Sequence, residues 1–270
     1  MNIERGLVKT RMGYMHYRAA GAVGGEAIFL QHINQQSSAL YLELMAVLSP
    51  SLRVVAMDYP SHGNSDHVDT QPAIGDYARC VVEVADALGI PKFSVLGEAV
   101  GAAVSIELAA NHAPRVSKAV LVNCPYYQDR SVADARHAPL KSGLRPEDAA
   151  GFPLTRTIEF FLRSDPGHAP VQPTQSWMDR VNIAQIEAGR HRWQALDALH
   201  QYELTANLQR IACPLLLLVG EHFYYIQYRH EFHSKNKHLK SIVLPGARFC
   251  MGWEHAAEVG RHTLDFLAAP

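Results

Sequence analysis

Residues 94–101 (SVLGEAVG) join an apolar run typical of a buried strand to a run of small residues typical of a helix start. Gly97 and Gly101 match the two outer glycines of the motif Gly-x-Ser-x-Gly. This motif forms a sharp strand-to-helix turn that exposes a serine oxygen. Ala99 stands at the serine position, and a methyl group cannot attack a carbonyl carbon. The stretch therefore predicts the turn without its usual nucleophile.

The composition is that of a globular chain with little net charge. The 270 residues are 48% hydrophobic and carry a formal net charge of -1, which allows a sizeable core and gives no electrostatic footprint for nucleic acid or an anionic membrane. No apolar run approaches the roughly 20 residues of a membrane helix, and the first residues lack the apolar centre of a signal peptide. Four scattered cysteines fit a reducing compartment. We predict a cytoplasmic protein that binds neither nucleic acid nor membrane, and leave open a homo-oligomer.

Fifteen histidines are dispersed along the chain, with a local group at His222, His230, His233 and His238. Carboxylates or cysteines at ligand spacing, which a metal site needs, do not accompany them. The group is therefore interpreted as a polar surface helix, and we predict neither a metal site nor a cofactor.

Apolar runs and helical patterns alternate in both end segments of the chain. Strands are expected at residues 6–10, 14–18, 27–30, 53–58, 93–96, 119–123, 214–220 and 241–244, and helices at 40–48, 74–88, 99–110 and 255–267. Such alternation is typical of a parallel sheet covered by helices on both faces. Between them, only helical patterns occur. We predict an α/β fold with a mostly parallel twisted sheet, formed by residues 1–124 and 205–270, and an inserted helical lid at residues 125–204.

Several segments, in this order, resemble the α/β-hydrolase superfamily. Residues 58–66 (DYPSHGNSD) are similar to its Asp-x-Pro-x-Gly-His-Gly loop, and residues 97–101 to its nucleophile turn. Residues 214–221 resemble the strand that leads to its catalytic acid. Residues 253–256 (WEHA) are similar to a signature of the lidded hydrolases that cleave carbon–carbon bonds in aromatic ring-cleavage products. The resemblance covers nearly the whole chain outside the lid and implies the α/β-hydrolase fold.

The resemblance also implies where a serine, an acid and a histidine should stand. The nucleophile position is Ala99, the acid position is Phe223, and the base position is Phe249. The His-Gly pair of the oxyanion loop appears as His32 and Ile33, and a β-branched residue resists the backbone shape that such a loop needs.

Two other interpretations of Ala99 are a substitution made to trap a substrate and a shifted alignment. A substitution made to trap a substrate would leave the acid and the base in place, whereas phenylalanine stands at both positions. Under a shifted alignment, Asp129 supplies an acid but neither a nucleophile nor a base. His255 belongs to the C-terminal signature, where packing or capping is the simpler role.

The substituted positions predict a largely apolar cavity floor, because aromatic rings bury large areas and stack on flat ligands. The residues expected to bind a ligand are His32, Ile33, Glu98, Ala99, Val100, Trp177, Phe223, Tyr224 and Phe249. Glu98 and His32 are the candidate catalytic residues, since a poorly solvated carboxyl or an imidazole facing the cleft can transfer protons. Hydrogen bonds to nearby backbone are the structural alternative for both. Arg248 is a candidate for binding a carboxylate or a surface residue, and Cys250 a nucleophile or an inert buried thiol.

Several functions compete at this point. The joint departures favour a protein that binds a small, largely apolar or aromatic ligand under its lid and is not a conventional serine hydrolase. A lyase, isomerase or cyclase that uses Glu98, His32 or tyrosines is one alternative. A hydrolase with relocated catalytic groups is another. A scaffold for protein interaction is a further one, and it would have side chains filling its cavity.

Overall fold

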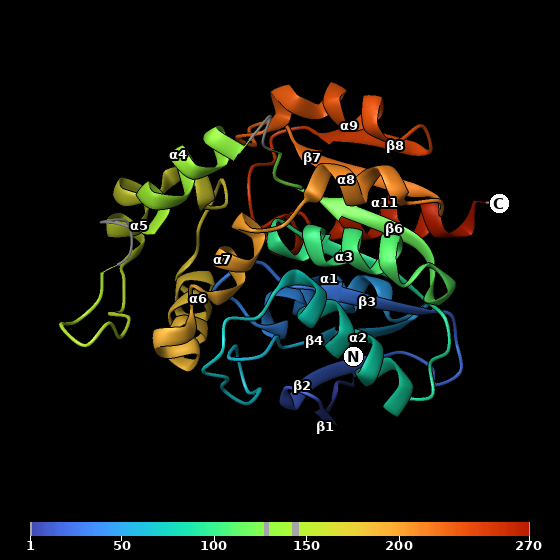
Figure 1. Ribbon diagram of the computed structural model, residues 1–270, viewed down its shortest axis with the longest axis horizontal. Helices are drawn as coiled ribbons and strands as arrows, with labels where there is room; N and C mark the ends of the chain where they lie inside the picture. The colour runs from blue at the N-terminus through green and yellow to red at the C-terminus, as the bar shows by residue number, and fades with distance from the viewer. Residues whose placement is uncertain (1, 127–129, 142–145, 270) are drawn as a thin grey trace.

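Eight strands form one sheet, and helices cover both of its faces (Figure 1). The computed structural model describes residues 2–126, 130–141 and 146–269. The strands are β1 Glu4–Thr10, β2 Gly13–Ala20, β3 Ala27–Gln31, β4 Arg53–Met57, β5 Phe93–Glu98, β6 Val116–Val122, β7 Leu215–Gly220 and β8 Leu239–Leu244. The α-helices are α1 Leu42–Leu48, α2 Ile74–Ala87, α3 Val100–Asn111, α4 Arg130–Lys141, α5 Ile158–Ser164, α6 Gln175–Ala188, α7 Gln194–His200, α8 Leu204–Arg210, α9 Arg229–Lys235, α10 Met251–Glu254 and α11 Ala256–Ala268.

The sheet has the strand order β1-β2-β4-β3-β5-β6-β7-β8. The β1–β2 and β2–β4 pairs are antiparallel, and each later pair is parallel. The carboxyl ends of β3, β5, β6 and β7 therefore meet at one edge, which is where ligands bind in open α/β sheets.

The central strands are buried on both faces, which explains why they read as continuous apolar runs. Every residue of β3, β4, β5 and β7 is buried. Phe29 and Val95 pack in the layer that contains α2, α3, α8 and α9, whereas Leu30 and Leu96 pack in the opposite layer with α1 and α11. Alternation of side chains along each strand thus builds two cores around one sheet.

The predicted α/β-hydrolase-like architecture is confirmed, including each of the eight expected strands. Between β6 and β7, the described residues form helices joined by loops, with one isolated bridge between Glu147 and Pro153 and no strand. The apolar pattern at 177–199 spans two helices, because the chain turns at Gly189 with φ of 55°. In this insertion between β6 and β7, α4, α5 and α6 lie to the left of the sheet in Figure 1, whereas α7 and α8 pack against α3.

Within the ranges that the structure describes, none of the helices is both long enough and apolar enough to cross a membrane. The cytoplasmic location, the homo-oligomer and the lid boundaries at 125 and 204 stay predictions.

Candidate functional site

The strand-to-helix turn at Ala99 is fully formed around a methyl side chain. Ala99 adopts φ 53° and ψ −111° between the end of β5 and the first residue of α3. A Cβ added to Gly97 would lie 2.0 Å from the Gly101 carbonyl oxygen, and one added to Gly101 would lie 1.9 Å from the Gln31 carbonyl oxygen. Close packing therefore requires both glycines, and the turn keeps its shape without a serine.

Backbone strain gathers around this turn. Among the described residues other than glycine, positive φ angles occur at Gln35, Ser61, Ala99, Asn123 and Cys250, and all of these but Ser61 line one cavity. Each such conformation costs about 1–3 kcal/mol and persists only where the surrounding structure enforces it. Strain of this kind typically marks functional sites, which makes the cavity the candidate site.

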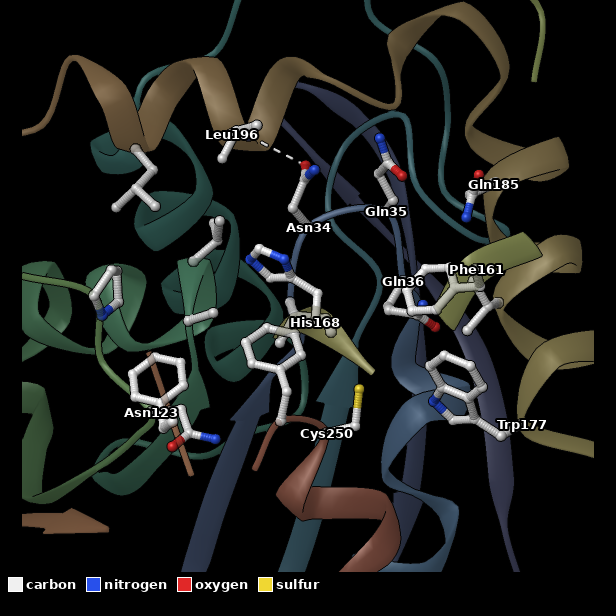
Figure 2. Close-up of a pocket in the computed structure, with 18 of the residues that line it drawn as sticks. Asn34, Gln35, Gln36, Asn123, Phe161, His168, Trp177, Gln185, Leu196 and Cys250 are labelled. Atoms are coloured by element: carbon white, nitrogen blue, oxygen red, sulfur yellow. Dashed lines mark hydrogen bonds between the residues drawn. The ribbon is translucent and has the colours of Figure 1, made fainter. Parts of the chain in front are cut away.

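The cavity lies between the carboxyl edge of the sheet and the insertion (Figure 2), and it holds roughly 810 Å³ of unfilled space, part of it open to solvent. Its apolar lining consists of Ile33, Ala99, Val100, Pro125, Phe161, Trp177, Val181, Leu196, Leu199, Phe223 and Phe249. Its polar lining consists of Asn34, Gln35, Gln36, Asn123, Arg156, His168, Gln185, Tyr225 and Cys250. An open, mostly apolar cavity with a few polar groups is typical of a small-molecule site.

Six of the nine residues predicted to bind a ligand line this cavity: Ile33, Ala99, Val100, Trp177, Phe223 and Phe249. The Phe223 and Phe249 rings stack at 6.1 Å and 17°, in line with the expected aromatic floor. The described lining does not include His32, Glu98 or Tyr224. In the loop after β3, the left-handed backbone conformation occurs at Gln35, with φ of 60°, and not at the β-branched Ile33.

His32 has contacts on both ring nitrogens. Nδ1 lies 2.8 Å from the Ile33 carbonyl oxygen, to which it donates, and Nε2 accepts from the Tyr59 backbone N–H at 3.1 Å. Burial lowers the pKa of His32 to about 3, so the ring stays neutral. These contacts hold the loop after β3 rather than present a proton acceptor to the cavity.

Glu98 ties three segments together beneath the turn. Its carboxyl accepts from Asn123 Nδ2 at 3.0 Å, from Met251 N at 3.1 Å and from Gly252 N at 3.4 Å. Burial raises the pKa of this carboxyl above its ordinary value, although the hydrogen bonds oppose the rise. The contacts favour the structural alternative, and proton transfer by Glu98 or His32 stays a prediction.

Of the remaining sequence candidates, Cys250 lines the cavity, whereas Tyr224 and Arg248 are not in its described lining. Tyr224 is 43% exposed, and its neighbour Tyr225 faces the cavity instead. Burial raises the pKa of the Cys250 thiol well above its ordinary value, which disfavours a thiolate nucleophile. Arg248 Nη1 donates to the Pro166 carbonyl oxygen at 3.1 Å. Asp129 lies outside the described residues.

A histidine–aspartate pair in the insertion was not found by sequence reasoning. His168 ends the short 3₁₀ helix η3, Pro166–His168, and its Nδ1 lies 2.5 Å from Oδ1 of Asp165. An ionised carboxylate only accepts hydrogen bonds, so Nδ1 donates and the neutral ring keeps an acceptor at Nε2. The Pro-Gly turn signal in 165–168 (DPGH), with a carboxylate and an imidazole three residues apart, is the sequence feature that could have indicated the pair.

The imidazole of His168 points into the cavity, as Figure 2 shows, and its ring meets that of Phe249 edge-on at 5.1 Å. Phe249 holds the position at which the resemblance implies the catalytic base. The His168 ring therefore lies beside the place where the base histidine is expected, although it comes from another part of the chain.

Two backbone segments face the cavity next to Ala99. Val100 is the first residue of α3, and the first N–H groups of a helix have no partner within the helix. The loop after β3 packs against this helix start, since a Cβ on Gly101 would lie 3.0 Å from the His32 carbonyl oxygen. Ile33, from that loop, lines the cavity beside Val100. No group of three or more histidine, cysteine, aspartate or glutamate side chains suited to a metal occurs within the described ranges.

A family model described as "Alpha/beta hydrolase family" matches residues 32–261. The chain belongs to the alpha/beta hydrolase family. It is 28% identical over 264 residues to the protein named "Putative carbamate hydrolase RutD" of Variovorax paradoxus, covering 94% of this chain and 96% of that protein. It is 27% identical over 185 residues to haloalkane dehalogenase 2 of Mycobacterium tuberculosis, covering 67% of this chain and 61% of that protein.

The crystal structure of an enol-lactonase from Burkholderia xenovorans superimposes with a TM-score of 0.77. It is 18% identical in sequence, and the match covers 98% of this chain and all of that one, so it supports the shared fold.

These relatives correct the leading functional prediction. The family and the names of the relatives point to hydrolysis, so the prediction of a ligand-binding protein outside hydrolysis is wrong, and so is the lyase, isomerase or cyclase alternative. The prediction relied on the side chains at Ala99, Phe223 and Phe249. The strand-to-helix turn and the cavity around these positions are intact. A hydrolase can use a proton acceptor from another part of the chain.

Proposed function

We propose that the protein is a hydrolase of a small, largely apolar substrate with an ester, amide or carbamate bond, and that the Asp165–His168 pair activates water in the cavity. The observation that carries the proposal is the His168 imidazole, held by Asp165 at 2.5 Å, in the same cavity as the turn at Ala99. The name of the Variovorax relative, a carbamate hydrolase, supports cleavage of an acyl bond. Residues 125–204 act as the lid of this cavity.

In the proposed reaction, His168 Nε2 takes a proton from a water molecule, and the hydroxide attacks the acyl carbon. The oxygen that becomes negative is held by the backbone N–H groups of Ile33 and Val100, which are placed before the reaction begins. The tetrahedral intermediate expels the alcohol or amine, which receives the proton from the His168 imidazolium. Asp165 keeps the imidazole in the required tautomer and stabilises its charged form.

The first experiment measures kcat/KM of the purified protein with a panel of aryl esters, a lactone and an aryl carbamate. His168→Gln should lower kcat/KM by about 10²-fold or more, because general-base catalysis contributes about 10²–10⁴-fold. His222→Gln is the matched control, since its side chain is 54% exposed outside the described lining, and it should retain full activity.

A fluorophosphonate, which reacts with activated serines, should leave the turnover unchanged because Ala99 has no hydroxyl. Full activity of a folded His168→Gln variant, or complete inhibition by the fluorophosphonate, would overturn the proposal.

A further inference from the structure

Helix α6 presents one face to the cavity, and a glutamine interrupts the apolar stripe on that face. Trp177, Val181 and Gln185 are four residues apart, and all of them line the cavity. Residues at this spacing lie above one another on a helix, and the face that a helix turns inward is normally apolar. Gln185 is 3% exposed, so packing alone would favour leucine at this position. A carboxamide that is buried to this degree needs a hydrogen-bonding partner.

Gln36, from the loop after β3, brings a second carboxamide into the cavity. It is 5% exposed and belongs to the lining. Figure 2 shows Gln36 and Gln185 on one side of the cavity and Asn123 on the other. Asn123 follows β6, next to the turn at Ala99. The two glutamines therefore lie away from the proposed site of bond cleavage.

The carboxamides of the lining differ in whether the protein already uses them. Asn123 Nδ2 donates to Glu98 Oε1 at 3.0 Å and to the Arg248 carbonyl oxygen at 2.8 Å. Within the described ranges, the side chains of Gln36 and Gln185 make no such hydrogen bond to the protein. Each of these two amides thus keeps its donors and its acceptor for a molecule in the cavity.

A neutral carboxamide is the group that matches these side chains in kind. Its oxygen accepts a hydrogen bond and its NH2 group donates, as in glutamine itself, whereas a carboxylate only accepts and leaves the glutamine oxygens unpaired. Arg156 also lines the cavity, but its guanidinium carbon lies 4.5 Å from the centre of the Phe161 ring, and the residue has further interactions. Its charge is therefore already engaged within the protein.

We infer that the substrate carries a neutral primary carboxamide, which Gln185 and Gln36 bind while the hydrolysable bond lies at the Ala99 turn. The inference rests on the proposed hydrolase function and adds the substrate class: a small ester, amide or carbamate with a second, unreactive carboxamide. Gln185 is then a specificity-determining residue, because an analogue that lacks the group leaves its buried amide unpaired.

The test compares 4-nitrophenyl esters of three acids that differ only at the far end: adipamate, the methyl ketone 6-oxoheptanoate and the apolar 6-methylheptanoate. The protein should prefer the carboxamide over the apolar ester by about tenfold or more in kcat/KM, with the ketone between them. Gln185→Leu should bring this ratio close to one, and Gln36→Leu should lower it. The ratio is the readout, because a substitution in the lining changes the absolute rates of all three esters.

Gln194→Leu is the matched control, since Gln194 is also buried but lies outside the described lining. Its Nε2 donates to the Val68 carbonyl oxygen at 2.8 Å and to that of Thr70 at 3.2 Å. This variant should have a lower Tm and an unchanged ratio. Gln185→Leu removes no hydrogen bond within the described protein, so it should leave the Tm unchanged or raise it.

Two results of the kinetic test overturn the inference. One is that folded Gln185→Leu and Gln36→Leu variants both keep the wild-type ratio. The other is a wild-type preference for 4-nitrophenyl hydrogen adipate over the carboxamide, since the site would then select a charge.

A second readout separates this inference from the proposed function. If the wild-type protein hydrolyses none of the esters, the proposed function loses its support, and binding alone then tests Gln185. Hexanamide should raise the Tm of the wild-type protein more than 2-heptanone, in which a methyl group replaces the NH2 group. This difference should vanish in Gln185→Leu. Equal shifts with both compounds in the wild-type protein also overturn the inference.

Discussion

The turn at Ala99 and the turn at Asp165–His168 face the same cavity but contribute different things. In the first, close packing of Gly97 and Gly101 holds a strained backbone conformation, and the side chain that lines the cavity is a methyl group. The second is a short turn of the insertion that carries a paired imidazole and carboxylate. The strained backbone turn and the paired titratable groups that face this cavity thus come from separate parts of the chain.

The two turns are linked through the C-terminal loop. Arg248 donates to the Pro166 carbonyl oxygen, and the Glu254 carboxylate accepts from the Val171 and Gln172 backbone N–H groups at 2.7 and 2.6 Å. The same loop is bonded to Glu98 through Met251 N. The insertion turn is therefore braced from the sheet side, and substitutions can address each turn separately.

The largest expected effect is a loss of stability from a substitution in the turn at Ala99. Gly101→Ala places a Cβ 1.9 Å from the Gln31 carbonyl oxygen, and backbone cannot give way cheaply there. We expect a loss of more than about 4 kcal/mol in the free energy of unfolding, or no folded protein, measured by urea denaturation. Gly75→Ala, in helix α2 with a nearest contact of 3.4 Å, is the control and should be neutral or slightly stabilising. A stable Gly101→Ala variant would contradict the close packing of the turn.

Asp165→Asn addresses the other turn and should lower kcat/KM by about 10²-fold with little change in Tm, because an amide no longer enforces the Nδ1–H tautomer of His168. Steady-state kinetics on an aryl ester measures the loss. Asp179→Asn, at an exposed position of α6, is the control. If both variants are equally active, the Asp165–His168 pair has no part in the reaction.

Acid should destabilise the sheet side through two buried imidazoles. Burial lowers the pKa of His32 to about 3 and that of His62 to about 4, whereas both bind a proton near pH 6.5 in the unfolded chain. Between these values the unfolded state binds more protons, so the free energy of unfolding falls as the pH falls from about 6.5 toward 4. Each group contributes a slope of about 1.4 kcal/mol per pH unit, and urea titrations at several pH values measure the sum.

His62→Gln should remove one of these two contributions and flatten the pH dependence. Its ring nitrogen Nδ1 lies 3.0 Å from the Pro60 carbonyl oxygen, a contact that glutamine can partly replace. An unchanged slope in this variant would mean that the destabilising protons bind elsewhere.

The smallest effect is expected at Ala99 itself. Ala99→Gly relieves the strain at φ 53° but frees the unfolded chain, so we expect a net change within about 1 kcal/mol, on the stabilising side. Ala103→Gly, inside helix α3, should instead destabilise by about 1 kcal/mol or more, and thermal unfolding of both variants gives the comparison. Equal losses in both would show that the strain at Ala99 is negligible.

Much of the frame could be predicted from the sequence, because buried parallel strands appear as apolar runs and the turn needs two glycines at fixed spacing. Most residues of the expected aromatic floor also line the cavity, Phe223 and Phe249 among them. His32 and Glu98 are not in the described lining of the cavity, although each is next in sequence to a residue that is. Their neighbours Ile33 and Ala99 face it, because successive side chains point in different directions.

The titratable part of the site could not be predicted in the same way. His168 and Arg156 reach the cavity from the insertion, which is far from the turn in sequence and has no strand pattern to fix its orientation. Tertiary contacts of the insertion with the C-terminal segment and with the loops after β3 and β4 hold it over the cavity. The function was mispredicted because it was inferred from the side chains at Ala99, Phe223 and Phe249, whereas the family and the relatives of the chain point to hydrolysis.

The insertion between β6 and β7 joins the core at two points only a few elements apart in the fold. The insertion leaves the sheet after β6 and returns to the core at α7 and α8, which pack on α3. The chain then enters β7, which pairs directly with β6 in parallel. We therefore expect that the segment between these points can be lengthened, shortened or exchanged for the insertion of another hydrolase without a change in strand pairing. A chimaera that carries the insertion of another hydrolase at these junctions would replace Arg156 and His168 together, and with them two polar side chains that the insertion contributes to the cavity lining.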